Sequence, residues 1–184
     1  TMLYSVNFPT INIGYAAGIG GVIIKTTDSG KTWSKQSNPI SNHIYRIFFL
    51  NKDTGYVAGR DGNIGRTYNG GQTWTKLASG TSTLLNYINF KNKNNGLAVG
   101  DDGLIISTTD GGTSWKNVNS GTNLLLNCVK YTSLNNVYTV GLNGLILKSS
   151  DGGNKWKNDN SGISDRLVSI CFPNEFTGYA VGAN

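Results

Sequence analysis

The chain has 184 residues, a formal net charge of +6, 25 glycines and only 38% hydrophobic residues. This glycine share, about twice the average, favours short strands joined by tight turns over helices. No apolar run is long enough for a membrane-spanning helix, and the lysines are too scattered for a typical nucleic-acid surface. Cys128 and Cys171 lack the spacing of a metal site, so we interpret them as two buried strand thiols, with a disulfide as the alternative.

The first 41 residues already contain a complete structural unit. LYSVNF at 3–8 predicts a strand A, GYAAG at 14–18 a strand B, and VIIKT at 22–26 a strand C after a short glycine turn. The stretch TTDSGKTW at 26–33 then turns the chain into a strand D. No segment shows the 3.6-residue apolar period of a helix, so the unit is predicted to be all-β.

The same unit returns along the chain at an interval of 41 residues. Tryptophan recurs at positions 33, 74, 115 and 156, and the strand A and strand B patterns keep the same spacing. Strand-rich repeats of this length are typical of propeller blades. We therefore predict a single β-propeller domain of four-stranded antiparallel blades, in which ring closure needs further blades or oligomerisation. The predicted blades are 1–41, 42–82, 83–123 and 124–164, with half of a fifth at 165–184.

The loop between strands C and D has the most chemical-looking pattern. An Asp or Asn side chain there can accept hydrogen bonds from backbone N–H groups one to three residues on, and a glycine supplies backbone freedom. The tryptophan offers an apolar face to wedge between blades. A turn tolerates the one asparagine copy, whereas a catalytic or metal-binding carboxylate generally would not. We predict a structural role for Asp28, Gly30, Trp33, Asn69, Gly71, Trp74, Asp110, Gly112, Trp115, Asp151, Gly153 and Trp156.

The loop matches the Asp-box pattern, Ser/Thr-x-Asp-x-Gly-x-Thr-Trp, of the bacterial neuraminidase repeat. With GYAVG and GLIISTT, the whole unit resembles the photosystem II stability/assembly-factor family of propellers over nearly the entire chain. This resemblance implies a non-enzymatic scaffold that binds another protein. We expect an extracellular, cell-surface or periplasmic location of bacterial type, although no signal peptide is visible. Because Asp boxes also occur in sialidases and other glycosidases, a carbohydrate-binding or glycoside hydrolase propeller is the alternative.

Resemblance to sialidases implies three substrate-binding arginines, a Tyr/Glu nucleophile pair and an aspartate acid/base. The chain has four arginines and one glutamate, Glu175, which falls in a predicted A–B loop on the face of the Asp boxes. Propellers commonly bind ligands at the opposite face, where the one close acid pair, Asp101–Asp102, is explained by a turn. The single histidine, His43, is interpreted as a surface residue. We predict no catalytic residue, no metal site and no cofactor.

The turns between strands B and C vary where the scaffold is constant, and recognition is normally built on such loops. The turns GRDG and GDDG would place a charged rim on neighbouring blades. Strand A varies at positions 46, 87 and 128, which we expect to reach the central channel, and the family resemblance adds an arginine-bearing face. The expected partner is another protein, or else a glycan, and not nucleic acid. The candidate partner-binding residues are Arg46, Arg60, Asp61, Arg66, Tyr87, Asp101 and Asp102.

Overall fold

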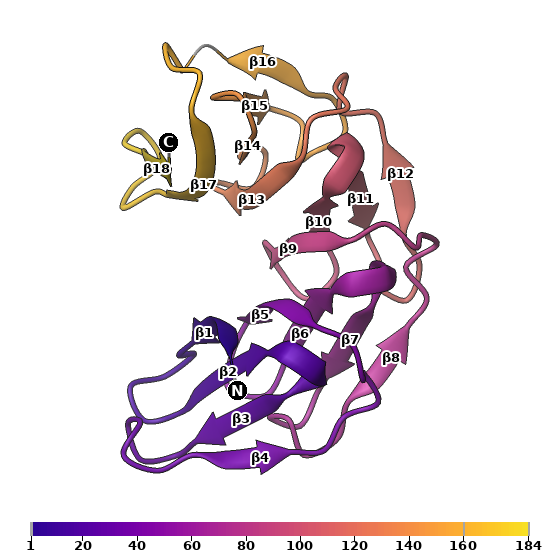
Figure 1. The fold of residues 1–184 in the computed structure, drawn as a ribbon, viewed down its shortest axis with the longest axis vertical. Coiled ribbons are helices and arrows are strands. Elements are labelled where there is room, and N and C mark those ends of the chain that lie inside the picture. Colours follow the sequence, from indigo (N-terminus) through magenta and orange to yellow (C-terminus); the bar gives the residue numbers. More distant parts are fainter. Residues whose placement is uncertain (1, 160, 184) are drawn as a thin grey trace. The chain divides into compact units, whose positions relative to one another are not determined.

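The computed structural model describes residues 2–159 and 161–183, and its strands form antiparallel sheets that follow the order of the chain (Figure 1). Four sheets have four strands each, and a fifth has two. The chain divides into two compact units, residues 1–88 and residues 89–184, and the boundary falls inside strand β9 (Leu85–Phe90).

The first unit contains two complete blades. The strands of the first sheet are β1 (Leu3–Asn7), β2 (Gly14–Gly18), β3 (Ile23–Thr26) and β4 (Ser34–Gln36). Those of the second are β5 (Ile44–Phe49), β6 (Gly55–Gly59), β7 (Ile64–Thr67) and β8 (Thr75–Leu77). Each of these sheets lies within one predicted repeat, so the prediction of four-stranded blades is confirmed in the first unit.

The second unit continues the same pattern. The third sheet consists of β9, β10 (Gly96–Gly100), β11 (Ile105–Thr108) and β12 (Lys116–Val118). The fourth has β13 (Leu126–Tyr131), β14 (Val137–Gly141), β15 (Ile146–Ser149) and β16 (Lys157–Asp159). The two-stranded sheet has β17 (Arg166–Cys171) and β18 (Tyr179–Ala183), the predicted half blade. A single domain for all five sheets stays a prediction.

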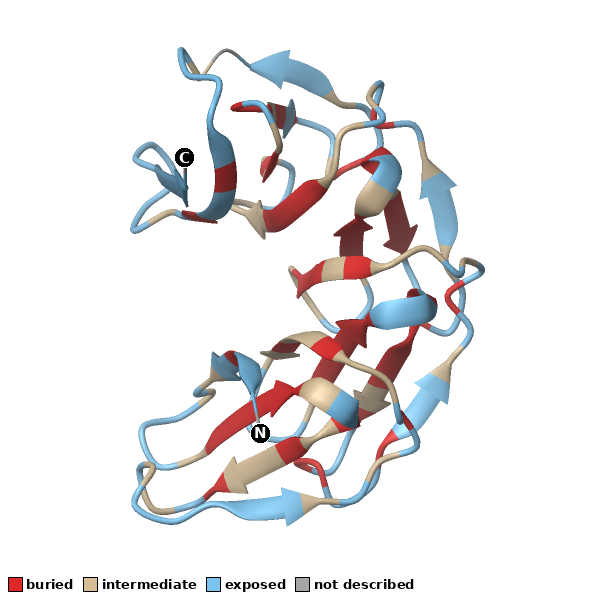
Figure 2. Ribbon diagram, in the orientation of Figure 1, coloured by how far each residue is buried: buried red, intermediate tan, exposed pale blue. Residues whose placement is uncertain are grey.

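Burial changes systematically across each four-stranded sheet. Figure 2 shows that β2, β6 and β10 are buried along their whole length, whereas β4, β8, β12 and β16 are mostly exposed. The second strand is buried because it lies between two others, while the fourth is an edge. The exposed lysines of these edge strands, such as Lys35 and Lys76, hinder pairing with another edge.

The turns between the second and third strands are tight and contain residues with positive φ. They include the one-turn 3₁₀ helices η1 (Ile19–Gly21), η2 (Arg60–Gly62) and η3 (Asp101–Gly103). In η2, Asp61 and Gly62 have φ of 58° and 64°, as in hairpin turns that favour Asp-Gly and Asn-Gly. A Cβ on Gly62 would lie 2.0 Å from the carbonyl oxygen of Thr81, so this position requires glycine.

The core of the first unit lies between its two sheets. The first sheet contributes the side of β2 and β3 that carries Tyr15, Ala17 and Ile23, which we call its trailing face. The second sheet contributes the side that carries Ile47, Phe49, Val57 and Trp74, which we call its leading face. The rings of Tyr15 and Phe49 stack with centroids 3.7 Å apart and planes 9° from parallel. Each blade therefore needs an apolar side toward both of its neighbours.

Candidate functional site

The loops between the third and fourth strands, residues 26–33, 67–74, 108–115 and 149–156, are here called the clasp loops. In the first, Thr26 Oγ1 donates to Asp28 Oδ1 (2.7 Å) and accepts from the backbone N–H of Asp28 (3.3 Å) and Gly30 (2.9 Å). The Asp28 carboxylate also accepts from Thr32, through its backbone N–H (2.9 Å) and hydroxyl (2.6 Å). The carboxylate thus closes a loop of five residues.

Sequence reasoning missed the centre of this network. The hydroxyl residue that opens each clasp loop is buried in all four copies, and it bonds to the Asp or Asn and to the glycine each time. These residues are Thr26, Thr67, Thr108 and Ser149. The acceptor bonds were expected from N–H groups one to three residues on. Asp151 does accept one from Asn154, three residues on, but the bond common to all four loops comes from the fourth residue on. The signal was present in the sequence as an unbroken Ser/Thr at one repeat position.

The two exceptions to the loop pattern keep its geometry. Asn69 accepts from the Thr73 N–H (2.9 Å), and its amide donates to the Thr73 hydroxyl (2.9 Å) where an aspartate would accept. Asp151 accepts from the backbone N–H groups of Lys155 (2.9 Å) and Asn154 (3.0 Å), although Lys155 has no hydroxyl. The loop therefore needs an acceptor oxygen and tolerates either charge state.

These hydrogen bonds determine the acidity of the clasp carboxylates. The side-chain and backbone bonds from Thr32 lower the pKa of Asp28 to about 2, and those from Ser114 lower the pKa of Asp110 to about 2. The backbone N–H of Lys155 lowers the pKa of Asp151. A carboxylate of such low basicity is a poor proton acceptor near neutral pH.

The glycine and tryptophan of each clasp loop complete its shape. Gly30, Gly71, Gly112 and Gly153 have φ between 80° and 98°. Trp33, Trp115 and Trp156 donate Nε1 to the carbonyl of that glycine at 3.1 Å. Trp74 is buried, and its Nε1 finds no acceptor among the described residues. The rings of Trp33, Trp74 and Trp115 meet those of Phe8, Phe49 and Phe90 edge-on, each pair with centroids 6.0 Å apart.

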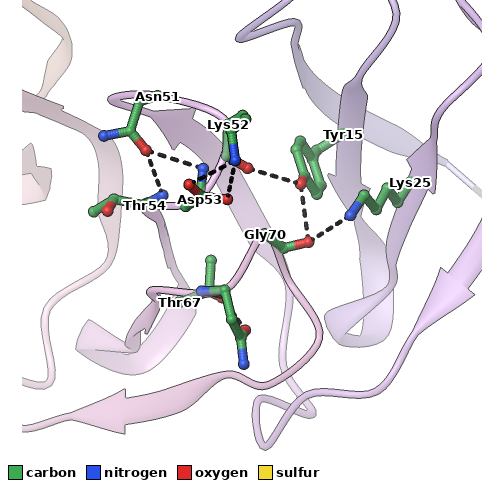
Figure 3. Close-up of polar contacts among 9 residues, drawn as sticks. Tyr15, Lys25, Asn51, Lys52, Asp53, Thr54, Thr67 and Gly70 are labelled. Carbon is green, nitrogen blue, oxygen red and sulfur yellow. Dashed lines mark hydrogen bonds and ion pairs between the residues drawn. The ribbon is translucent and has the colours of Figure 1, made fainter.

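In the first unit, the second clasp loop is also held by the preceding sheet. Figure 3 shows Tyr15 and Lys25 converging on the carbonyl oxygen of Gly70, with Tyr15 Oη at 2.9 Å and Lys25 Nζ at 2.8 Å. Tyr15 and Lys25 are cross-strand partners on β2 and β3. Burial, and secondarily the charge of Asp53, raises the pKa of Tyr15 to about 12, so the phenol stays a donor. We call this arrangement the carbonyl clamp.

Arg66, one of the predicted partner-binding residues, occupies the repeat position of the clamp lysine, Lys25. The cross-strand pairs at this position are Tyr15–Lys25, Tyr56–Arg66, Leu97–Ser107 and Tyr138–Lys148. A cation is therefore present wherever the partner is tyrosine, and Arg66 is the counterpart of Lys25. Its guanidinium lies over the ring of Tyr68, 4.4 Å from the centroid.

Two other predicted contacts pack on each other inside the first unit. The Arg46 guanidinium lies over the Tyr87 ring at 4.1 Å, and its NH1 is 3.5 Å from Ser5 Oγ. Tyr87 is only 8% exposed, and Arg46 Nε is buried without a hydrogen-bond acceptor among the described residues. In the second unit Cys128 is fully buried, with its thiol 3.9 Å from the carbonyl oxygen of Ile170. These side chains contribute to packing between neighbouring sheets.

The predicted turn residues of the first unit lie at the surface. The side chains of Arg60 and Asp61 are more than half exposed, with Nε and Oδ1 3.8 Å apart, and Asn42 donates to Asp61. In the second unit, Asp101 is half-buried, and Asp102 is exposed with a φ of 56°. A charged rim spanning both turns stays a prediction.

Beside the Arg60 turn lies an aromatic group that sequence reasoning did not select. Tyr4 and Tyr45 stack with centroids 5.0 Å apart, and the His43 ring lies 6.5 and 6.3 Å from them. The His43 carbonyl accepts from the Arg60 N–H (2.9 Å), and its Nδ1 accepts from the Gly20 N–H (3.3 Å). We call Tyr4, His43 and Tyr45 the tyrosine patch. The two tyrosines are one repeat apart, a signal that a comparison of strand A positions could have found.

One expectation about the cysteines is wrong. Cys128 is buried, but Cys171 is exposed, and the two do not form a disulfide. The copies at the Cys171 position are Asn7, Phe48, Asn89 and Lys130, so three of the four are polar. Among residues 2–159 and 161–183, no cluster of three His, Cys, Asp or Glu side chains could hold a metal ion. Within the same residues, no helix has the length and apolar character needed to cross a bilayer.

Residues 32–183 match the model of the DUF6242 beta propeller domain. The chain belongs to this family. No curated protein matches the DUF6242 chain.

Solved structures similar to this DUF6242 chain are also propellers, and at these low identities they show the fold alone. YCF48 from Cyanidioschyzon merolae has 15% identity and a TM-score of 0.55, over 100% of this chain and 94% of that one. YCF48 bound to D1 peptide gives 15% and 0.55, over 98% and 90%. The GH74 enzyme of Niastella koreensis gives 18% and 0.68, over 84% of this chain and 28% of that one. The chain thus spans most of YCF48 but about a quarter of the GH74 enzyme.

Proposed function

We propose that the chain is a non-catalytic propeller module that binds another protein through the tyrosine patch and the adjoining Arg60 turn. The observation that carries this proposal is the stack of the exposed Tyr4 on the half-buried Tyr45 beside an exposed arginine. Tyrosine and arginine are enriched among the residues that dominate binding energy at protein interfaces. The rings are already stacked in the free chain, so binding would cost little side-chain ordering.

The chemistry of the carboxylates supports a binding role over catalysis. The clasp aspartates are fully engaged by their own loops, and their lowered pKa values make them poor bases. Asp61 lies at the turn beside Arg60 and accepts from Asn42.

YCF48 has been solved with a bound D1 peptide, so a propeller of similar fold can hold a peptide. As the sequence resemblance implies, we further propose a location outside the cytoplasm.

The proposal is tested by selecting binders from a random peptide-display library and measuring the affinity of one selected peptide by calorimetry. Tyr45→Ala and Arg60→Ala should each weaken binding about tenfold or more, as truncation of central contacts does. Tyr68→Ala is the control, because Tyr68 is an exposed tyrosine that lies on a clasp loop and outside the tyrosine patch. Equal loss with the control, or binding that neither patch variant changes, would refute the proposal.

A glycan is the second candidate ligand, because exposed tyrosine rings can also stack on the apolar face of a sugar. A glycan array run with the same variants separates the two ligand classes. Glycan binding that is lost in Tyr45→Ala, with no peptide recovered from the library, would favour the carbohydrate-binding alternative.

A further inference from the structure

The leading face of the first sheet is exposed, although its counterpart in the second sheet is buried. Val6, Phe8 and Trp33 are 55%, 45% and 37% exposed. The residues one repeat later, Ile47, Phe49 and Trp74, are 0%, 5% and 8% exposed. A groove of about 490 Å³ lies on this face, lined by Tyr4, Val6, Ala16, Ile24 and Trp33 among others. The repeat thus shows that this face has the composition of a blade-to-blade contact.

The face is also preformed for a particular ring. Phe8 and Trp33 meet edge-on at 6.0 Å and 88°, as Phe49 and Trp74 do at 6.0 Å and 90°. On the pair in the second sheet lies Tyr15, from the trailing face of the sheet before it. The exposed Phe8–Trp33 pair therefore presents the same packing surface for a tyrosine ring.

A matching trailing face is exposed on the β17–β18 sheet. Tyr179 and Val181 occupy the repeat positions of Tyr15 and Ala17, and each is 60% exposed. The tyrosine-on-phenylalanine contact recurs in the second unit, where Tyr138 lies 4.9 Å from Phe172. Phe8 and Tyr179 are thus the exposed counterparts of a ring pair that the chain forms at Tyr15–Phe49 and Tyr138–Phe172.

We propose that the leading face of the first sheet binds the β17–β18 sheet of a second copy of this chain, with Tyr179 of one copy stacked on Phe8 of the other. The occupant is a second copy because the chain carries both complementary faces, and because its own sheet contacts are the template. Two different patches meet, so the contact is heterologous, and it builds either closed rings or open chains of copies. The net charge of +6 opposes association, which should therefore strengthen as salt is added.

The test is sedimentation velocity on the chain over a range of concentrations. Wild type should self-associate, and Val6→Asp or Val181→Asp should each weaken association about tenfold or more, since each places a charge in an apolar contact. Both positions are exposed in the free chain, so both variants should fold. Ile11→Asp and Phe176→Asp are matched controls, because they add the same charge at exposed apolar residues of neighbouring loops.

Mixing the two variants decides the orientation of the contact. Val6→Asp keeps an intact trailing face and Val181→Asp an intact leading face, so a mixture should form a one-to-one dimer that neither variant forms alone. A wild-type chain that stays monomeric at every concentration would overturn the proposal. A mixture that stays monomeric, or controls that dissociate equally, would overturn it as well.

Discussion

The contacts between neighbouring sheets inside the first unit differ from those inside the second. In the first unit, Tyr15 and Lys25 hold the carbonyl of Gly70. In the second, leucine replaces the tyrosine, and Lys91 Nζ donates instead to the Leu134 carbonyl at 2.8 Å. Leu134 is the repeat counterpart of Lys52, whose carbonyl is also 3.5 Å from Tyr15 Oη. An ammonium-to-carbonyl bond is thus common to both junctions, but Lys25 lies on strand β3, whereas Lys91 lies in the loop after β9.

The comparison shows that the repeat keeps the same kind of interaction between neighbouring sheets even where the residues that make it differ. Leu97 packs at the position of the next clasp loop, since a Cβ on Gly153 would lie 2.7 Å from Leu97 Cδ1. Apolar packing there replaces the phenol, and a lysine from the neighbouring loop replaces the clamp cation. In the first unit, therefore, Tyr15 and Lys25 hold a carbonyl beside the stacked rings of Tyr15 and Phe49. In the second unit, an apolar contact of Leu97 is accompanied by an exposed hydrogen bond from Lys91.

The largest effect should come from removing the ring at the first junction. Tyr15→Ala should destabilise the first unit by about 3–5 kcal/mol, because a fully buried aromatic ring leaves a cavity beside Phe49. Urea unfolding, with hydrogen exchange resolved by unit, measures this cost. Leu97→Ala should cost about 2–5 kcal/mol in the second unit. The exposed Tyr68→Ala should stay within about 0.5 kcal/mol. A Tyr15→Ala cost near the control would show that the ring stack is not what holds the first junction.

Next in size is the difference between the two lysines. Lys25→Met keeps the alkyl stem but loses a half-buried charged hydrogen bond, which should cost about 1.5–3 kcal/mol. Lys91→Met loses an exposed bond and should cost less than about 1 kcal/mol. The same unfolding assay at low and high salt separates them, since only the exposed contact should weaken strongly with salt. Equal costs would contradict the distinction between the junctions.

A smaller effect should follow from moving the second junction into the first unit. Tyr15→Leu with Lys25→Ser reproduces Leu97 and Ser107 but leaves the Gly70 carbonyl without its two donors. Pro9 is the repeat counterpart of Lys91, so adding Pro9→Lys should restore about 1 kcal/mol of stability by supplying a new ammonium donor. Pro9→Met in the same background is the control. Recovery with methionine as large as with lysine would show that the gain comes from losing the proline.

Much of the fold follows from the sequence, because the period, the turn glycines and the alternating strands all depend on local interactions. The Asp-Gly pattern of the turns predicts their positive φ, and the tryptophan spacing predicts the sheets. The site is harder to predict, because it depends on which side chains meet across neighbouring sheets. Arg46 looks free in the sequence, yet it packs on Tyr87, and Tyr4 gains significance only because Tyr45 stacks on it.

The smallest effect concerns acid, and it separates the units by their clasp loops. The clasp loops of the first unit contain one carboxylate, Asp28, with the neutral Asn69 at the equivalent position, whereas those of the second contain Asp110 and Asp151. Their pKa values lie below the ordinary 3.8, at about 2 for Asp28 and Asp110, so the unfolded chain binds protons first as pH falls. The stabilisation is fully present above the ordinary value and is lost as pH falls through the folded value.

The second unit should therefore lose more stability than the first between about pH 4 and pH 2. Urea titrations at pH values spanning this window measure the loss, and Asp110→Asn should flatten it, because Asn69 shows that an amide closes the same loop. The reciprocal change, Asn69→Asp, should steepen the acid dependence of the first unit. If Asp110→Asn leaves the acid dependence unchanged, the clasp carboxylates do not account for it, and the loops act through geometry alone.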